Sequence, residues 1–317
     1  MCQYLVRWIC QPALAAVVWL SASAAATAGS PTCTVSMSSI AFGSVDVLAG
    51  SAIDTTATLT VSCSGGSGAG QRLCISIGAG SASDATSRKL TGPGSNAARY
   101  DLYKDTARTQ LWGSWQTGYD IAGVQLDVPQ SSTRNVTVYA RFLGSQQTIV
   151  AGSYVATFSA DPFIQYDNLG SVACPVGART ASTSTSATAT VVSRCNVSAS
   201  NINFGTLGSL ISNTDAAGTM AIQCNSTLPY TVSLDGGTSG AVNPTQRKMA
   251  LGSNNVIYGL YRDSARTLPW GAVVGTDTAA GTGNGLTQNP TVYGRIPPQS
   301  TPATGVYCDT IVVTVGY

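Results

Sequence analysis

The sequence predicts an all-β protein with two tandem antiparallel sandwiches, and three observations support this prediction. First, residues 100–113 (YDLYKDTARTQLWG) recur as residues 258–271 (YGLYRDSARTLPWG), with an offset of 158 residues and nine of fourteen positions identical. Second, the chain has no His or Glu and only three Lys, which disfavours surface helices. Third, short alternating runs rich in Thr, Val and Tyr are typical of strands. The length suffices for two domains, each with its own core.

The first residues, 1–28, have the pattern of a cleaved secretory signal. Arg7 precedes an apolar run from Pro12 to Leu20, and small residues follow as far as Ala28. A retained membrane anchor is the alternative, but this run is short for a bilayer span. No later segment is long and apolar enough to span a membrane, so we expect an exported protein without an integral membrane segment after cleavage.

The expected strands occur in the same order in both halves. In the first half, alternating apolar residues mark strands around residues 33–35, 57–63, 75–77, 100–103, 136–142 and 152–158. The second half has matching segments around residues 195–197, 220–224, 232–234, 258–261, 292–295 and 305–311. Six or seven strands per repeat, separated by turns, predict two sandwiches of Ig-like type.

The domain boundaries follow from this repeat. The first domain is expected over residues 29–176, a linker rich in Ser and Thr over 177–190, and the second domain over 191–317. The net charge of +2 gives no electrostatic reason to expect a nucleic acid or an acidic membrane surface as partner.

Cysteine spacing predicts disulfides, because seven of the nine cysteines lie after the signal and an exported protein is oxidised. Intervals of 30 and 29 residues recur in the two halves, which pairs Cys33 with Cys63 and Cys195 with Cys224. Each bond would join the first strand of a domain to its second. Metal binding is disfavoured, since the cysteines have no His and no CxxC motif beside them.

Three further cysteines lack a counterpart in the other half. The simplest pairing joins Cys74 to Cys174 and leaves Cys308 over, and the competing arrangement pairs Cys174 with Cys308.

The duplicated block reads as a strand that leads into a polar turn. Its acid and cation lie close enough to pair across the turn in each copy: Asp105 with Arg108, and Asp263 with Arg266. Trp112 or Trp270 can then cover the core edge. A structural role is favoured over a site, because two diverged copies keep the same elements.

The two halves differ after the last common strand. The first half continues through Cys174, whereas in the second half Ile311, Val313, Val315 and Tyr317 alternate to the last residue. If the second sandwich needs a seventh strand, this segment forms an open edge that another chain would have to cover. The alternative is that six strands close the sandwich by themselves.

The chain resembles two spore coat protein U (SCPU) domains in tandem. The resemblance rests on Cys33, Phe42-Gly43 and Cys63, on the Leu-Tyr-x-Asp-x-x-Arg-Thr-x-x-Trp-Gly block in both halves, on Tyr293-x-Arg295-x-Pro297, and on Gly305-x-Tyr307-x-Asp309. It covers nearly all of the chain after the signal. The first half departs from the pattern, because it lacks the Pro after Arg141 and the Asp after Tyr154.

This resemblance implies a subunit of an archaic chaperone-usher pilus, with an incomplete Ig-like fold held by a periplasmic chaperone, passed to an usher and completed by a neighbouring pilin's donor strand. Ile311, Val313, Val315 and Tyr317 would then border the acceptor groove. Only residues 29–32 precede Cys33, too few for a typical donor strand, so we expect the tip adhesin, exported through the periplasm to the cell surface.

In that case the first domain contacts an abiotic or host surface. Trp115, Tyr119 and Trp112 are the candidate contact residues, because exposed aromatic side chains suit hydrophobic surfaces or sugars. The alternative for Trp112 is a place in the core, as we expect for Trp270.

Three other functional classes fit the sequence less well. An enzyme is disfavoured, because without His and Glu acid-base chemistry falls to Asp, Lys, Tyr or Cys, and no nucleophile elbow or metal spacing is present. We therefore expect no catalytic residues, metal or cofactor. A structural coat or matrix protein is one alternative. A carbohydrate-binding module is another, and it would align aromatic side chains on one exposed face.

Overall fold

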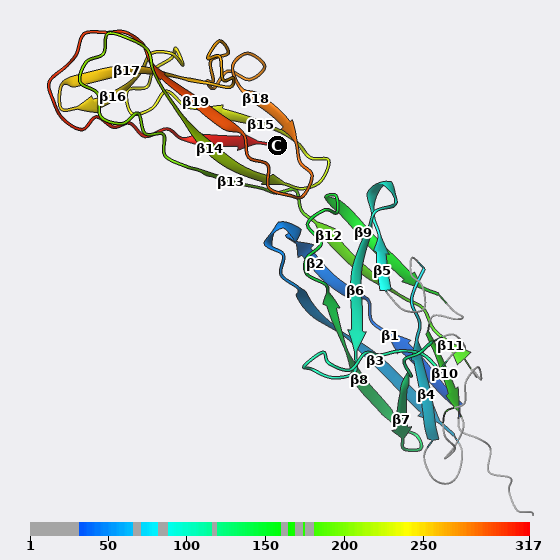
Figure 1. Cartoon of the computed structure of the whole chain (residues 1–317). Coiled ribbons are helices and arrows are strands. Elements are labelled where there is room, and N and C mark those ends of the chain that lie inside the picture. The colour runs from blue at the N-terminus through cyan, green and yellow to red at the C-terminus, as the bar shows by residue number, and fades with distance from the viewer. Residues whose placement is uncertain are drawn as a thin grey trace, which may run out of the picture.

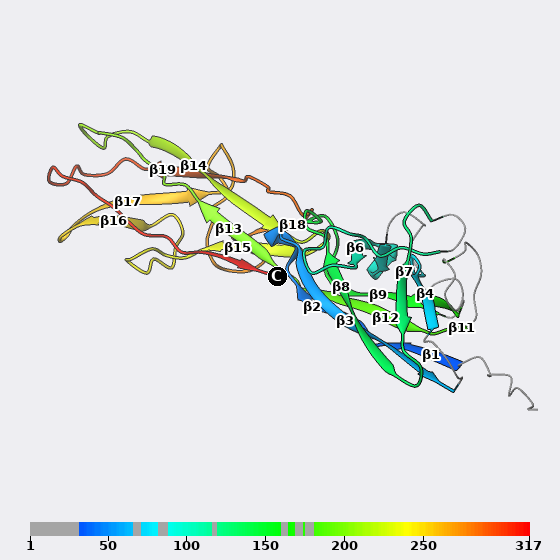
Figure 2. The same ribbon diagram turned by 90° about the horizontal axis from the view of Figure 1, so that it is seen from below.

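The computed structural model describes residues 32–65, 71–81, 88–115, 119–159, 164–168, 174 and 181–317. The expected signal, 1–28, and residues 177–180 of the expected linker lie outside these ranges. The described chain forms two β-sandwiches arranged end to end (Figures 1 and 2), so the predicted all-β class is confirmed.

The first sandwich has a large and a small sheet. The large sheet runs in the order β1 (Thr32–Met37), β3 (Ile53–Ser64), β8 (Thr133–Phe142), β6 (Ala97–Tyr103), β5 (Arg88–Thr91), β9 (Gly152–Phe158), β12 (Thr185–Val191) and β2 (Ile40–Val45). The small sheet runs in the order β11 (Ala181–Ser182), β10 (Ile164–Asn168), β4 (Gln71–Ile77) and β7 (Val124–Val128). Two short 3-10 helices are η1 (Val47–Ala49) and η2 (Pro93–Ser95).

The second sandwich repeats this plan with fewer strands. Its larger sheet runs in the order β13 (Cys195–Ala199), β14 (Thr214–Cys224), β19 (Thr291–Ile296), β17 (Asn254–Tyr261) and β16 (Arg247–Leu251). Its smaller sheet runs in the order β18 (Ala279–Thr282), β15 (Pro229–Leu234) and β20 (Val313–Gly316).

Each sandwich encloses its own hydrophobic core. Alternate residues of β3, including Leu59 and Val61, point into the first core, and Met220 and Ile222 of β14 do the same in the second. Phe42 packs edge-on against Tyr100 in the first core, with ring centroids 5.7 Å apart. The two halves of the sequence repeat thus fold around two separate cores, one in each sandwich.

The described residues contain three disulfides, with the pairings expected from the sequence. Cys33–Cys63 joins directly opposite residues of β1 and β3, and Cys195–Cys224 joins directly opposite residues of β13 and β14. Cys74–Cys174 closes a segment with a sequence separation of 100 residues, which on chain-entropy grounds stabilises the first sandwich by about 4.7 kcal/mol. Cys308 is exposed and free.

Residues 181–182 and 185–190 differ from the expected linker, because they belong to strands β11 and β12, and Val191, expected in the second domain, ends β12. Ala187, Ala189 and Val191 are buried, and the Thr residues between them face solvent. The composition suggested a linker because its apolar residues are small. The same composition suits a strand, since Thr and Val fit a half-buried sheet and Ala fits a narrow space between neighbours.

The two sandwiches touch at the junction that follows β12. The Arg194 guanidinium lies 3.1 Å from the Asp46 carboxylate, which belongs to the first sandwich. Val150 forms a parallel bridge with Ser226, and buried Asn225 accepts a hydrogen bond from the Arg194 backbone. The ion pair and the bridge connect the second sandwich to the end of the first.

Candidate strand-acceptor site

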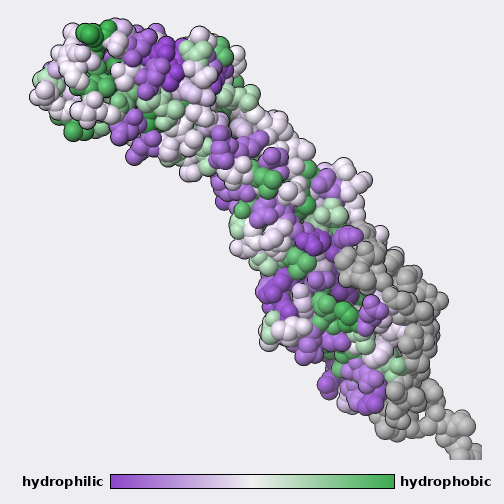
Figure 3. Space-filling model, in the orientation of Figure 1, coloured by the Kyte–Doolittle hydropathy of each residue, from purple (hydrophilic) through white to green (hydrophobic). Residues whose placement is uncertain are grey.

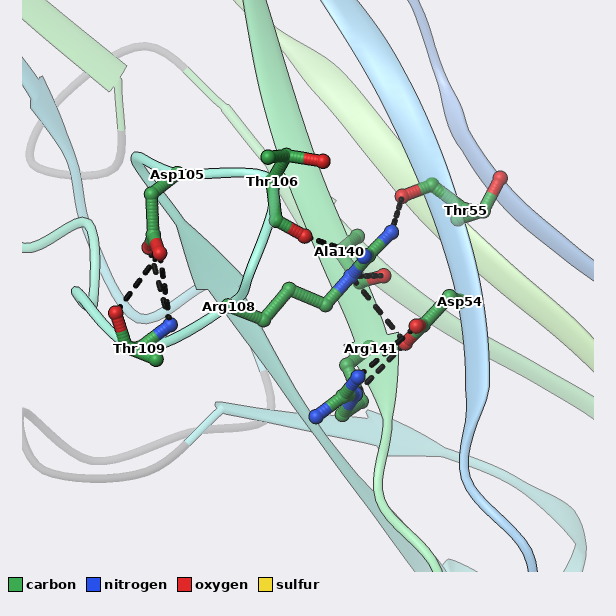
Figure 4. Close-up of polar contacts among 8 residues, drawn as sticks. All are labelled: Asp54, Thr55, Asp105, Thr106, Arg108, Thr109, Ala140 and Arg141. Atoms are coloured by element: carbon green, nitrogen blue, oxygen red, sulfur yellow. Dashed lines mark hydrogen bonds and ion pairs between the residues drawn. The ribbon is translucent and has the colours of Figure 1, made fainter.

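In the duplicated turn, Asp105 and Arg108 do not pair with each other as expected, because each side chain contacts other residues. The Asp105 carboxylate accepts a hydrogen bond from the Thr109 backbone at 3.0 Å (Figure 4) and another from the Gln110 backbone at 2.8 Å. Arg108, in a left-handed conformation with φ 57°, reaches across the sheet to Asp54 at 3.2 Å. Arg141 also binds Asp54 with both arms of its guanidinium, at 2.7 and 2.9 Å.

The second copy reproduces this arrangement. Asp215 takes the place of Asp54 and contacts Arg295 at 2.7 Å and Arg266 at 3.2 Å, while Asp263 accepts from the backbone of Thr267. The hydrogen bond from Arg141 holds the pKa of Asp54 below its ordinary value, and Arg295 does the same for Asp215. Both turns are therefore structural clamps between strands far apart in the sequence.

The aromatic candidates in the first sandwich are mostly covered. Trp112 is only 1% exposed and lies in the core, so it cannot contact a surface, which corrects its place among the surface candidates. Its counterpart Trp270 is also buried, and its indole donates a hydrogen bond to the Val232 carbonyl at 3.0 Å.

Trp115 and Tyr119 are half-buried on one side of the first sandwich. The Trp115 backbone donates to the Ser76 hydroxyl at 2.9 Å, and the Tyr119 hydroxyl accepts from the Ala79 backbone at 2.9 Å. Their remaining surface is open to solvent, and Ile121 beside them is 40% exposed. On the face that Figure 3 shows, hydrophobic and hydrophilic residues are interspersed over both sandwiches.

Strand β12 completes the first sandwich. It pairs antiparallel with β9 along its full length and parallel with β2 on its other edge, so it lies between β2 and β9. Its inward side chains meet fully buried neighbours on both sides, as Ala187 does opposite Ala156 and Ala189 opposite Tyr154.

The equivalent place in the second sandwich is open. The segments that match β2 and β9, residues 202–207 and 305–311, form no strand, and no strand among the described residues lies between them. Ile202 and Phe204 correspond to Ile40 and Phe42, yet they are half-buried where the first pair is buried.

Residues 305–311, which were expected to form a strand, show the same contrast. Tyr307 and Ile311 are half-buried, whereas Tyr154 and Phe158 at the matching positions are covered by β12. A single bridge between Ala250 and Cys308 connects this segment to β16. The backbone on its other edge faces the position that β12 fills in the first sandwich, so the second sandwich presents an open edge beside half-buried core residues.

The predicted edge residues fall on this open edge with one difference. Ile311, Val313 and Val315 are half-buried against the second core, and Val313 and Val315 belong to β20, which pairs with β15. Tyr317 is 57% exposed. Sequence reasoning missed Ile202, Phe204 and Tyr307 as members of the site. Aligning these residues with their buried counterparts in the first half would have indicated them.

We call this set of six residues the open face. Its members are Ile202, Phe204, Tyr307, Ile311, Val313 and Val315. Phe204 packs edge-on against Tyr258, with centroids 6.2 Å apart, as Phe42 does against Tyr100.

A polar cluster lies inside the open face. The Asp309 carboxylate accepts hydrogen bonds from the Tyr258 hydroxyl at 2.7 Å and from the Thr238 hydroxyl at 2.7 Å. Burial opposes ionisation of Asp309, but these hydrogen bonds outweigh it and keep its pKa below the ordinary value. Burial and the bond to Asp309 raise the pKa of Tyr258, so the pair is a carboxylate and a neutral phenol.

Arg247 of β16 and Arg88 of β5, the matching residue of the first half, both have a structural role. Arg247 is buried and donates to the carbonyls of Asp235 at 2.8 Å and Trp270 at 2.9 Å. Arg88 donates to the carbonyls of Ile77 and Trp112 at 2.7 and 2.6 Å. Each guanidinium thus satisfies loop carbonyls that the sandwich would otherwise bury unpaired.

Within the described ranges no group of three or more His, Cys or acidic residues is placed to hold a metal ion. The described part of the chain contains no helix that is long and apolar enough to cross a membrane.

Comparisons with known proteins agree with this architecture. Residues 19–161 and 181–314 each match the family described as Spore Coat Protein U domain. Protein U of Myxococcus xanthus is 27% identical over 159 residues, which cover 45% of this chain and 88% of that protein.

A similar solved structure is a chain of the CsuC–CsuE chaperone–tip adhesion subunit pre-assembly complex from the archaic chaperone-usher Csu pili of Acinetobacter baumannii. It superposes with a TM-score of 0.54 at 17% identity, over 90% of this chain and 100% of that chain. The likeness supports the predicted Ig-like sandwich fold.

Proposed function

The chain belongs to the Spore Coat Protein U domain family, and from this premise we propose that it is a non-enzymatic adhesin subunit of a chaperone-usher type pilus. Its second sandwich accepts a donor strand from the next pilin subunit, and its first sandwich contacts a surface. A periplasmic chaperone covers the open face before assembly, and an usher exports the subunit to the pilus tip.

One observation carries the proposal. The first sandwich contains its own completing strand, β12, and matched positions of the second sandwich are half-buried without one. An exposed row of core side chains beside unpaired backbone favours addition of a strand from another chain. The Csu complex, which pairs a chaperone with a tip adhesion subunit, has the same fold and fits this assignment.

The tip position is supported by the division of labour between the sandwiches. A sandwich that is complete by itself needs no neighbour, so it can stand at the end of a polymer and face outward. The open sandwich then serves as the joint to the rest of the pilus. We assign the surface contact to the side of the first sandwich that carries Trp115 and Tyr119.

The test is to append a copy of residues 181–191 after Tyr317 in the full chain. Twelve residues, 169–180, separate β10 from β11, so a Gly/Ser linker of that length suits the copy. In the register of the first sandwich, Ala187 of the copy lies opposite Asp309 and Thr188 opposite Cys308. We expect strong hydrogen-exchange protection of the amides of residues 305–311 only with the copy attached.

Cys308 reports the register independently. Opposite residues of an antiparallel pair have Cα atoms about 4.5–5.5 Å apart, which is within disulfide reach. A copy carrying Thr188→Cys should therefore form a disulfide with Cys308, and one carrying Thr190→Cys, displaced by two residues, should react far more slowly. Equal protection of residues 305–311 with and without the copy would instead indicate a self-sufficient sandwich and favour a structural coat protein.

A further inference from the structure

Asp309 occupies the one inward position of the open edge where the two halves differ in charge. Its counterpart in the first sandwich is Ala156, which is fully buried and lies opposite Ala187 of β12. An incoming strand in the same register would place one of its inward side chains directly opposite Asp309. At this position an incoming strand would therefore face a carboxylate, whereas β12 faces a methyl group in the first sandwich.

The Asp309 carboxylate is fixed in place before any strand arrives. One oxygen accepts from the Thr238 backbone at 2.8 Å and from the Thr238 hydroxyl at 2.7 Å, and the other accepts from the Tyr258 hydroxyl at 2.7 Å. The carboxylate also rests against Gly237, where an added Cβ would collide with it. In the first sandwich, by contrast, the buried Tyr100 hydroxyl has no hydrogen-bond partner among the described residues.

Strand insertion would seal this carboxylate from water, as β12 seals Ala156. The buried guanidinium of Arg247 already interacts electrostatically with Asp309. The carboxylate therefore does not need a second cation from the incoming strand. A large incoming side chain would have to displace the fixed carboxylate, and an acidic one would bring two like charges together in a desolvated site. Like charges juxtaposed in an interface cost several kcal/mol, which makes them effective for rejecting wrong partners.

We propose that Asp309 is a specificity-determining residue of the strand-acceptor site. It restricts the residue opposite it in the incoming strand to a small, uncharged one such as Gly, Ala or Ser, and it rejects an acid. The partner is thus an extended segment of a neighbouring subunit with a small neutral residue at this register position. This inference rests on the proposed strand acceptance and names one feature of the donor.

The experiment uses the full chain with the appended copy of residues 181–191 and varies only Ala187 of that copy. Each copy also carries Thr188→Cys, and the rate of disulfide formation with Cys308, with a fixed excess of oxidised glutathione as the oxidant, measures occupancy of the site. We expect Ala and Ser at this position to give equal rates. Ala187→Asp should lower the rate about tenfold or more, because of like-charge repulsion in a desolvated site, and Ala187→Leu should lower it through steric conflict.

Two controls separate charge from other effects. A copy with Ser186→Asp carries the same acid on the opposite, outward face of the strand and should react like the parent copy. In an Asp309→Asn chain, which keeps the shape of the side chain, the Ala187→Asp penalty should largely disappear while the Ala187→Leu penalty remains.

The outcomes distinguish this inference from the proposed function. If the parent copy gives no cross-link and no protection of residues 305–311, strand acceptance itself is wrong. If the parent copy works and Ala187→Asp works equally well, only the role of Asp309 is overturned. A penalty for Ala187→Asp that persists unchanged in the Asp309→Asn chain would also overturn it.

Discussion

At the residue scale, the two halves share ion pairs between Asp and Arg residues that lie far apart in the sequence. Asp54 and Asp215 each lie between two Arg side chains, one from the duplicated turn and one from the directly opposite residue of the neighbouring strand, β8 or β19. The Arg108 guanidinium also lies over the Tyr139 ring, 5.6 Å from its centroid, and Arg266 lies likewise over Tyr293. Each carboxylate thereby ties three segments of its sandwich together.

These clamps make stability dependent on acid pH. The pKa values of Asp54 and Asp215 are lowered in the folded state by their Arg partners. Each carboxylate therefore stabilises the fold fully above its unfolded pKa of about 3.9, and this contribution is lost as the pH falls through the lowered folded-state pKa. In urea titrations from pH 7 to pH 2, we expect Asp54→Asn to cost about 1 kcal/mol at neutral pH and to flatten the acid decline.

The exposed pair between Asp127 and Arg72 provides the matched control, because water and salt screen it. Asp127→Asn should change the unfolding free energy less than Asp54→Asn does. An Asp54→Asn chain with the same acid profile as the parent would contradict the clamp.

At the element scale, β12 shows how small residues complete a sandwich. Ala187 and Ala189 fit between β9 and β2, where the facing residues are already packed to full burial. The strand has small side chains on its inner face and polar side chains on its outer face, which suits a strand placed between β2 and β9. Cys174, which precedes this strand in the sequence, is bonded to Cys74 of β4.

Enlarging the inner face of β12 should destabilise the first sandwich. We expect Ala189→Leu to lower the free energy of unfolding by about 1–3 kcal/mol, because extra methylene groups cannot be accommodated in a close-packed core. Thr188→Leu, on the outer face, is the matched control and should change it little. Urea unfolding measures both variants, and equal effects would contradict the observed orientation of the strand.

At the scale of the whole molecule, the two similar sandwiches differ in how they are completed. The first is closed by its own strand, and the second keeps the open face, while the ion pair of Asp46 and Arg194 joins them end to end (Figure 1). The proposed surface contact and the proposed strand acceptance thus belong to separate sandwiches, so each can be lost without the other.

Adhesion of cells that display the protein tests this separation. We expect the double variant Trp115→Ala/Tyr119→Ala to reduce attachment severalfold, because aromatic side chains supply the apolar contact area of such surfaces. Val273→Ala/Val274→Ala is the matched control, because these exposed residues lie in the corresponding loop of the second sandwich. Unchanged attachment of the first variant, with wild-type stability of the purified protein, would place the contact elsewhere.

The local and periodic features of the fold were predictable from the sequence. The repeat of residues 100–113 indicated two equivalent sandwiches, and the matching intervals of the cysteines indicated two of the disulfides. Alternation predicted most strands, because successive side chains of a strand face opposite sides. These properties depend only on neighbours in the chain or on repetition along it.

The tertiary structure decided which distant segments meet. Asp105 and Arg108 are close in sequence, but the turn directs Arg108 toward Asp54, 54 positions before it. Residues 185–191 had the composition of a linker and became a strand only because β2 and β9 offer two free edges beside a narrow core. Ile202 and Phe204 belong to the open face because no strand among the described residues fills the position that β12 fills in the first sandwich. The local sequence around these two residues does not indicate that a neighbouring strand is missing.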